Sequence, residues 1–446
     1  MTVQNFNSYY NKMLAQWIIE KKRNGRPLSQ DEIAFFIQGY ARGEIPDYQM
    51  SALAMAIYFK GMTFPEVTAL TDSMIRSGKV LTLSSIKKQK VDKHSTGGIG
   101  DKVSLILAPL VACCEIAVPM MSGRGLGITG GTLDKMESIP GYRVNLKPYE
   151  FISVLKKCGC SMIGQTPELV PADRKLYALR DVTATVPSIP LISASIMSKK
   201  IAEGSDSLVL DVKWGKGAFM KTRLEAKTLA RTMVEIGKRM GKGMVAILTD
   251  MNQPLGRSVG NAVEVIECIE TLKGNGPDDL VEITLTLGAH MLLLGQAARS
   301  KEQALNILQN KITSGAAFNK FREMVNLHGG KVEYLNNPSQ LPHAKHHFAC
   351  PSPRSGYVSM VDAELIGRAC IILGAGRKTI DDKIDHAAGI TGIVKIGEKV
   401  NKGQPLLILH ANERKKLTEA GTLIGNAIKL GREHVRPPKL VTDLIK

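Results

Sequence analysis

The chain has 446 residues, 44% of them hydrophobic and 22% charged, which is enough for two or three domains with sizeable cores. Its longest uncharged apolar run, residues 103–114, contains a proline and is too short to cross a bilayer, so we expect a soluble protein without a membrane partner. The net charge of +18 suits a nucleic-acid-binding protein, but the basic residues are scattered and no nucleic-acid-binding motif accompanies them. Small anionic substrates suit this charge equally well, and we expect no specific nucleic-acid partner.

The cysteines and the first residues indicate the compartment. The seven cysteines are an odd number, most of them lie in apolar stretches, and their spacing is not that of metal ligands. The first 14 residues lack the apolar segment of a secretory signal. We therefore expect reduced thiols, a cytoplasmic protein and no metal site.

The beginning of the chain has the pattern of short helices. Ser29 with Glu32 and Thr63 with Glu66 form capping-box patterns, and apolar residues follow at helical spacing. Residues 171–204 have the same character although they come much later. We predict that they pack back on residues 1–78, which gives a small all-helical domain built from two chain segments.

From residue 89 the pattern changes to an alternation of strand, glycine-rich loop and helix. This order recurs through residues 89–170 and 205–340 and predicts a large α/β domain with a mostly parallel sheet. Residues 345–446 contain alternating apolar positions and turn residues, which predict a C-terminal α+β unit. Ligands of such parallel sheets bind beyond the carboxyl ends of the strands, where the glycine-rich loops lie.

Two of these loops indicate an anion site. Each of the stretches "VDKHSTGGIGDKVSL" (91–105) and "SGRGLGITGGTLDKMES" (122–138) offers free backbone amides and a helix amino end, which together favour phosphate. The first loop lacks the Gly-Lys-Ser/Thr ending of a nucleoside triphosphate loop. The side chains proposed to complete the phosphate site are Lys93, Ser95, Ser104, Ser122 and Thr132.

Other functions remain open on these residues alone. Gly125, Gly127 and Gly130 satisfy the GxGxxG pattern of dinucleotide-binding oxidoreductases, although that pattern is weak by itself. A catalytically idle phosphate- or nucleoside-binding protein is a second alternative. A nucleic-acid-binding role of the basic surface is a third, and it is compatible with an enzymatic function.

The two glycine-rich stretches closely resemble the motifs of the thymidine and pyrimidine-nucleoside phosphorylases. Further similar blocks follow in the same order at 164–200 and 249–265, and the similarity covers nearly the whole chain. The resemblance implies a homodimer whose active site lies in the cleft between the helical and the α/β domain. It also implies that inorganic phosphate, as co-substrate, cleaves a pyrimidine nucleoside reversibly to the free base and a sugar 1-phosphate. Positioning and electrostatics suffice for this reaction, so we expect no further cofactor.

The resemblance also assigns the site residues. The five side chains proposed for phosphate match the phosphate ligands of the family. The residues that match its pyrimidine-binding site are His94, Arg180, Ser195 and Lys199. Of these, we expect His94, Arg180 and Lys199 to be catalytic. The spacing of Ser195 and Lys199 independently places them on one face of a helix.

Two apolar residues predict the preferred nucleoside. Met120 stands where relatives with broad activity often have lysine, and Phe219 offers an apolar wall near the base. We expect both to line the pyrimidine site and to favour thymidine and deoxyuridine over uridine. The main sugar product would then be 2-deoxyribose 1-phosphate, which comes from the two deoxynucleosides. The alternative is a broad-specificity pyrimidine-nucleoside phosphorylase that also uses uridine.

The sequence departs from the family pattern at two positions. Ile128 stands where relatives commonly have histidine, which points to altered loop packing or phosphate affinity. Lys102 replaces a threonine that in some relatives lies near a bound potassium ion. The other residues that match this monovalent-cation site are Gly100, Leu255, Ser258 and Glu267. A lysine there can replace the cation, which makes a potassium requirement doubtful.

Overall fold

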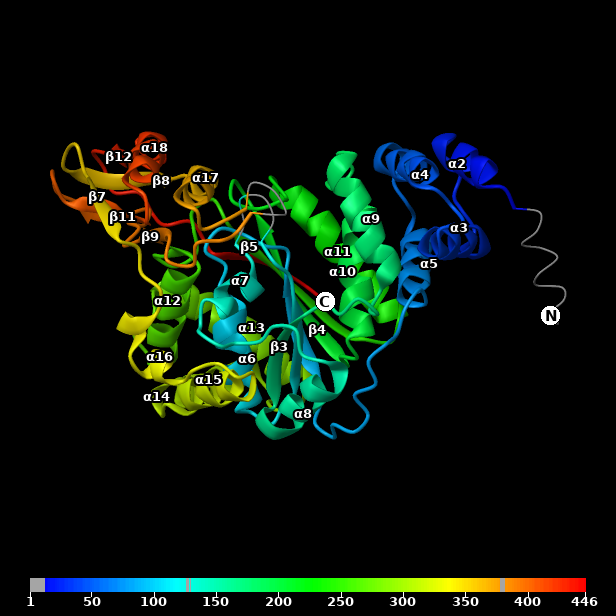
Figure 1. The fold of residues 1–446 in the computed structure, drawn as a ribbon, viewed down its shortest axis with the longest axis horizontal. Helices are drawn as coiled ribbons and strands as arrows, with labels where there is room; N and C mark the ends of the chain where they lie inside the picture. The colour runs from blue at the N-terminus through cyan, green and yellow to red at the C-terminus, as the bar shows by residue number, and fades with distance from the viewer. Residues whose placement is uncertain (1–12, 126–127, 129, 378–381) are drawn as a thin grey trace.

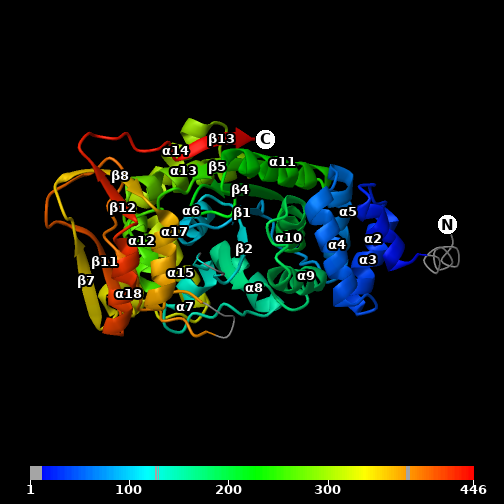
Figure 2. The same cartoon turned by 90° about the horizontal axis from the view of Figure 1, so that it is seen from above.

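The computed structural model describes residues 13–125, 128, 130–377 and 382–446. A helical domain lies at one end of the elongated molecule, an α/β domain in the middle and a smaller mixed domain at the other end (Figures 1 and 2). The predicted fold class is therefore confirmed.

The helical domain combines two distant chain segments. α10 packs on α5, and α9 packs on α3 and α4, so the later segment completes the earlier one as predicted. Both expected capping boxes are formed, by Ser29 with Glu32 and by Thr63 with Glu66. The helices are α2 (Ala15–Arg23), α3 (Gln30–Arg42), α4 (Asp47–Lys60), α5 (Phe64–Ile75), α9 (Pro171–Val182) and α10 (Ile189–Ala202).

The α/β domain contains the parallel sheet. β4 (Ser207–Trp214) pairs in parallel with β1 (Val91–Ser95) and β5 (Gly243–Asp250), and β2 (Val118–Ser122) pairs in parallel with β3 (Cys160–Gly164). A parallel bridge between Lys90 and Ala117 joins the two sets of strands. The helices of this domain are α6 (Val103–Ala112), α7 (Thr132–Glu137), α8 (Pro148–Cys158), α11 (Arg223–Arg239), α12 (Ala262–Leu272), α13 (Asp278–Leu294), α14 (Lys301–Thr313), α15 (Ala316–Leu327) and α16 (Glu333–Asn336).

The C-terminal domain is built on antiparallel strands. β11 pairs with β7 and β9, while β8 pairs with β10 and β12. Its elements are β7 (His346–Pro351), β8 (Gly356–Val361), α17 (Ala363–Leu373), β9 (Gly389–Thr391), β10 (Lys399–Val400), β11 (Pro405–Ala411), α18 (Arg414–Ile424) and β12 (Ile428–Gly431). This domain has an apolar core of its own, separate from the main core that the other two domains share.

The last strand differs from the predicted domain boundary. β13 (Val441–Ile445) leaves the C-terminal domain and pairs antiparallel with β5 at the edge of the main sheet (Figure 2). Val441 and Ile445 pack against the main core, which explains why this segment returns to the α/β domain. Among the described residues, no helix is both long and apolar enough to span a membrane.

Candidate active site

The first glycine-rich loop begins where β1 ends and leads into α6. Gly97 and Gly100 have φ values of +88° and +75°, a region that side chains other than glycine rarely adopt. The Cα of Gly100 also lies against the carbonyl groups of Leu255 and Ser258, where a Cβ would collide. Glycine is therefore required at this bend for both conformation and space.

Three predicted phosphate ligands surround this loop. The buried Nζ of Lys93 lies 3.4 Å from the hydroxyl of Ser104, in the first turn of α6. The Ser95 hydroxyl donates to Asp101 at 2.5 Å and accepts from the backbone N–H of Gly97 at 3.0 Å. The first loop thus places a cation and two hydroxyls together.

The second loop lies beside the first. Ser122 ends β2 and Thr132 begins the short helix α7, while residues 126, 127 and 129 of the loop fall outside the described residues. Lys135 connects the two loops, because its Nζ donates to the carbonyl of Asp101 at 3.1 Å and to that of Gly130 at 3.3 Å. Both loops therefore lie together at the carboxyl ends of neighbouring parallel strands.

Ser195 and Lys199 share one face of α10, as predicted. The Lys199 ammonium donates to the Ser195 hydroxyl at 2.9 Å and to Asp173 at 2.7 Å. Asp173 lies in α9 and was not predicted from the sequence. Its carboxylate holds the flexible lysine in a fixed position on the helical domain.

Arg180 is almost completely buried. Its guanidinium donates to the carbonyls of Thr185 and Val186 in the turn between α9 and α10, and to the carbonyl of Leu191 in the first turn of α10. Burial lowers the pKa of Arg180 to about 10, so the group remains charged at neutral pH. These three bonds leave two of the five N–H groups of arginine for a ligand.

His94 lies between the two domains. Burial and the positive charges of Lys200, Lys199 and Lys93 lower the pKa of His94 well below its ordinary value. A neutral imidazole therefore stands at the end of β1, close to the lysines of α10. In this form it can donate a hydrogen bond but carries no proton to release as an acid.

The two apolar residues predicted to line the pyrimidine site differ in exposure. Met120 is only 1% exposed and lies in the main core beside Met162, so the structure does not place its thioether at an open cleft. Phe219 is 45% exposed, and its ring lies over Gly97 of the first loop. Phe219 is therefore a surface aromatic next to the candidate site and no core residue.

The ammonium of Lys102 occupies the predicted cation position. It donates to the carbonyls of Leu255 and Ser258 at 3.1 and 2.7 Å and to the carboxylate of Glu267 at 2.5 Å. Burial opposes its charge, but the carboxylates of Glu267 and Glu264 outweigh that effect and raise the pKa of Lys102. The protein's own Lys102 side chain thus supplies the positive charge among these oxygen atoms.

Ile128 packs against the apolar core of the C-terminal domain, close to Gly367 of α17. The carboxylate of Asp134 supports the same region, because it accepts from the backbone N–H of Gly125 at 2.6 Å and from Arg377 at 2.9 Å. The second loop is therefore attached to the C-terminal domain by both apolar and charged contacts.

The sequence did not reveal a group of buried charges beneath the loops. Asp211 and Lys213 are fully buried on β4, and the Lys213 ammonium faces both Asp211 and Asp101. A signal was available, because two charged residues alternate within the otherwise apolar strand "LVLDVKW". Such residues on one face of a buried strand need charged partners.

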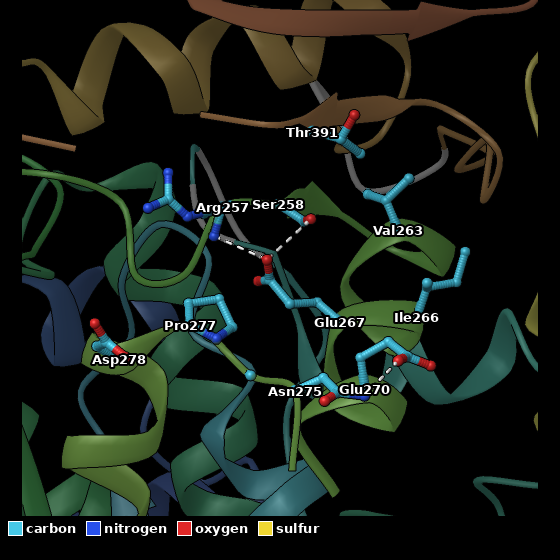
Figure 3. Close-up of a pocket in the computed structure, with 11 residues that line it drawn as sticks. Arg257, Ser258, Val263, Ile266, Glu267, Glu270, Asn275, Pro277, Asp278 and Thr391 are labelled. Carbon is cyan, nitrogen blue, oxygen red and sulfur yellow. Dashed lines mark hydrogen bonds between the residues drawn. The ribbon is translucent and has the colours of Figure 1, made fainter. Parts of the chain in front are cut away.

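An open cavity of about 610 Å³ lies between α12 and the C-terminal domain (Figure 3). Ser258 and Glu267 line it together with Thr391 of β9, and Glu267 accepts hydrogen bonds from the Ser258 hydroxyl and the Arg257 backbone. None of the residues predicted to bind phosphate or pyrimidine lines this cavity.

Comparison with known proteins agrees with this architecture. Residues 87–318 match the model of the glycosyl transferase family a/b domain, residues 16–78 its helical bundle domain, and residues 357–431 the pyrimidine nucleoside phosphorylase C-terminal domain. Pyrimidine-nucleoside phosphorylase of Staphylococcus aureus (strain MSSA476) is 50% identical over 428 residues, which cover 96% of this chain and 98% of that protein. The enzyme of the same name from Geobacillus stearothermophilus is 49% identical, with coverage of 96% and 99%.

A solved structure shares the fold at low sequence identity. Anthranilate phosphoribosyltransferase from Thermus thermophilus superposes with a TM-score of 0.58 at 16% identity, over 70% of this chain and 99% of that one. This likeness concerns the fold alone.

Proposed function

Because the chain belongs to the pyrimidine-nucleoside phosphorylase family of pentosyltransferases, we propose that it catalyses the reversible phosphorolysis of thymidine and deoxyuridine to the free base and 2-deoxy-α-D-ribose 1-phosphate. The observation that carries this proposal is the meeting of two glycine-rich loops with buried Lys93 at the carboxyl ends of β1 and β2. Such a place suits an anion. His94 lies between it and α10, because the charges of both Lys93 and the α10 residues Lys199 and Lys200 act on this imidazole.

The proposed chemistry divides between the two domains. On the α/β domain, Lys93 and the four hydroxyls hold phosphate against the anomeric carbon of the sugar. On the helical domain, Lys199 and Arg180 donate to the pyrimidine oxygens, where negative charge develops as the glycosidic bond breaks. His94, which is neutral, stabilises the departing base by a hydrogen bond.

The preference for 2-deoxynucleosides is the finer part of the proposal. Phe219 supports it as an exposed aromatic beside the first loop. We expect kcat/KM for thymidine and deoxyuridine to exceed that for uridine by about 10- to 200-fold, the usual discrimination of an apolar pocket. Phosphate-dependent release of base from each nucleoside, measured separately, checks this ratio. Equal efficiency on uridine and thymidine would favour the broad-specificity alternative, and no release from any of them would reject the proposed function.

The division of roles predicts different kinetic effects on the two sides. Lys93→Ala should raise the KM for phosphate by about 10²-fold, because it removes the buried charge that meets the anion. Lys199→Ala should instead lower kcat/KM for the nucleoside by about 10²- to 10³-fold. Initial rates with each substrate varied in turn separate these effects. Near-normal turnover of Lys199→Ala or Arg180→Ala would refute the assigned pyrimidine site.

We also propose that the enzyme needs no potassium, because the ammonium of Lys102 supplies the positive charge among Leu255, Ser258 and Glu267. Its three short contacts are those that a bound monovalent cation would make with the same oxygen atoms.

Lys102→Thr should convert the protein into a cation-dependent one. Losing one partner of a buried ion pair costs about 3–5 kcal/mol, so we expect a lower Tm and lower activity in a tetramethylammonium buffer, and recovery of both when potassium is added. The parent protein in the same series of salts is the control. A parent enzyme that requires potassium would contradict the proposal.

A homodimer is proposed on the surface of the helical domain. α4 buries Met50, Leu53 and Ile57 on one face yet leaves Tyr48 and Phe59 73% and 74% exposed on another. A second copy of the chain would cover these aromatic rings.

Phe59→Asp should therefore shift the protein from dimer to monomer, because it places a charge in the apolar contact. Sedimentation equilibrium measures the change. Phe348→Asp is the matched control, since it alters an exposed phenylalanine of the C-terminal domain. A Phe59→Asp protein that remains dimeric would place the contact elsewhere.

A further inference from the structure

Four charged side chains form a buried group beneath the first glycine-rich loop. Lys93 on β1, Asp211 and Lys213 on β4, and Asp101 in the loop are almost completely enclosed, and their charges sum to zero. Only Lys93 of this buried group was predicted to contact a substrate. The other three need an explanation, because enclosing a charge is costly unless it serves the fold or the site.

Lys93 is only weakly bound within the group. Its Nζ lies 3.8 Å from Asp211, 4.0 Å from Asp101 and 3.4 Å from the Ser104 hydroxyl. These separations exceed those of a charge-assisted hydrogen bond, so the ammonium retains donor capacity. A buried ammonium with unused hydrogen-bond donors can bind an anion.

Lys213 instead lies next to the carboxylates. Its Nζ is 2.8 Å from Asp211 and 3.9 Å from Asp101, but it makes no hydrogen bond of good geometry with any residue that the structure describes. Its side chain runs directly below Gly98, where a Cβ would come within 2.8 Å of the Lys213 Cδ. The backbone N–H of Lys213 also donates to the Thr96 hydroxyl at 2.9 Å, which ties the strand to the loop.

The two carboxylates are oriented by other partners. Asp211 accepts from the Thr249 hydroxyl at 2.6 Å, and Asp101 accepts from Ser95. Burial alone would favour the neutral acid, but the positive charges of Lys213 and Lys93 keep the pKa of Asp101 well below its usual range. Two negative charges therefore stand beside the anion site and must be balanced.

We infer that Lys213 is a positioning residue of the phosphate site, which balances Asp101 and Asp211 so that the ammonium of Lys93 stays available to the substrate anion. This inference rests on the proposed function. Without Lys213, the two carboxylates bind Lys93 fully and leave a net negative charge beside the place that phosphate must enter. The two lysines thus have separate tasks, Lys213 within the protein and Lys93 toward phosphate.

Single and paired charge changes test this division. Lys213→Met should raise the KM and the Kd for inorganic phosphate by about 10- to 100-fold. This is the effect of one uncompensated carboxylate charge acting on a nearby anion in a protein interior. Asp211→Asn keeps the shape and the Thr249 contact but removes a negative charge, so it should lower both constants. The double variant restores neutrality and should return them to within a few-fold of the parent values. The KM for the nucleoside should change little in all three.

A buried lysine far from the loops provides the control. Lys22 in α2 is paired with Glu66 at 2.7 Å and is 3% exposed. Lys22→Met should lower the Tm as a buried charge is left unpaired, yet leave the phosphate constants unchanged. This variant separates a loss of stability from a loss of phosphate affinity.

The possible results are distinct. Phosphate constants unchanged in Lys213→Met, or a double variant as weak as Lys213→Met, would overturn the inference. If Lys213→Met does not fold, the other two variants decide. The neutral double variant should then bind phosphate as the parent does, and Asp211→Asn should bind it more tightly. Weaker phosphate binding in both variants would contradict the inference. Isothermal titration with phosphate is measured beside turnover. A parent protein that binds phosphate without releasing base would reject the proposed function and leave the comparison of variants intact.

Discussion

Buried ammonium groups paired with carboxylates determine how the two glycine-rich loops sit on the sheet. Lys93, Lys102, Lys135 and Lys213 are buried beside or beneath the loops, and Asp101, Asp211, Glu264 and Glu267 balance them. Glycine-rich backbone has little side-chain packing of its own, so its position must be held by other elements. Lysine suits this task because one ammonium can donate to several carbonyl groups at once, as Lys102 and Lys135 do.

The same type of contact joins the helical domain to the sheet. The Lys200 ammonium of α10 donates to Asp92 of β1 at 2.5 Å, to the Met121 carbonyl of β2 at 2.8 Å and to Glu203 at 3.1 Å. Lys199, the next residue, faces Ser195 and Asp173 instead. Neighbouring lysines on one helix therefore have different tasks: Lys200 connects two domains at the base of the proposed active site, and Lys199 remains on the side of the proposed pyrimidine.

The C-terminal domain contributes to the site through the second loop. Arg377 reaches Asp134 at the start of α7, and Ile128 packs against the apolar core of that domain. Ile128 thus gives the loop an apolar anchor at the position where relatives commonly have histidine. The chain then returns through β13 to the edge of the main sheet, so that the C-terminal domain is connected to the α/β domain at both of its ends.

Local patterns in the sequence determined the fold class, both capping boxes, the strand-loop-helix alternation and the shared face of Ser195 and Lys199, because each depends on residues close together in the chain. The family motifs, which extend over many consecutive residues, identified the family. The roles of the predicted phosphate and pyrimidine ligands stay predictions.

Only the tertiary structure decided which distant residues meet. It placed Met120 in the core, tied Arg180 to the α9–α10 turn and returned β13 to the main sheet. It also gathered Asp101, Asp211 and Lys213 from segments more than 100 residues apart. The sequence could not reveal these contacts, because the partner of a buried charge is selected by the packing of strands and loops and leaves no periodic pattern along the chain.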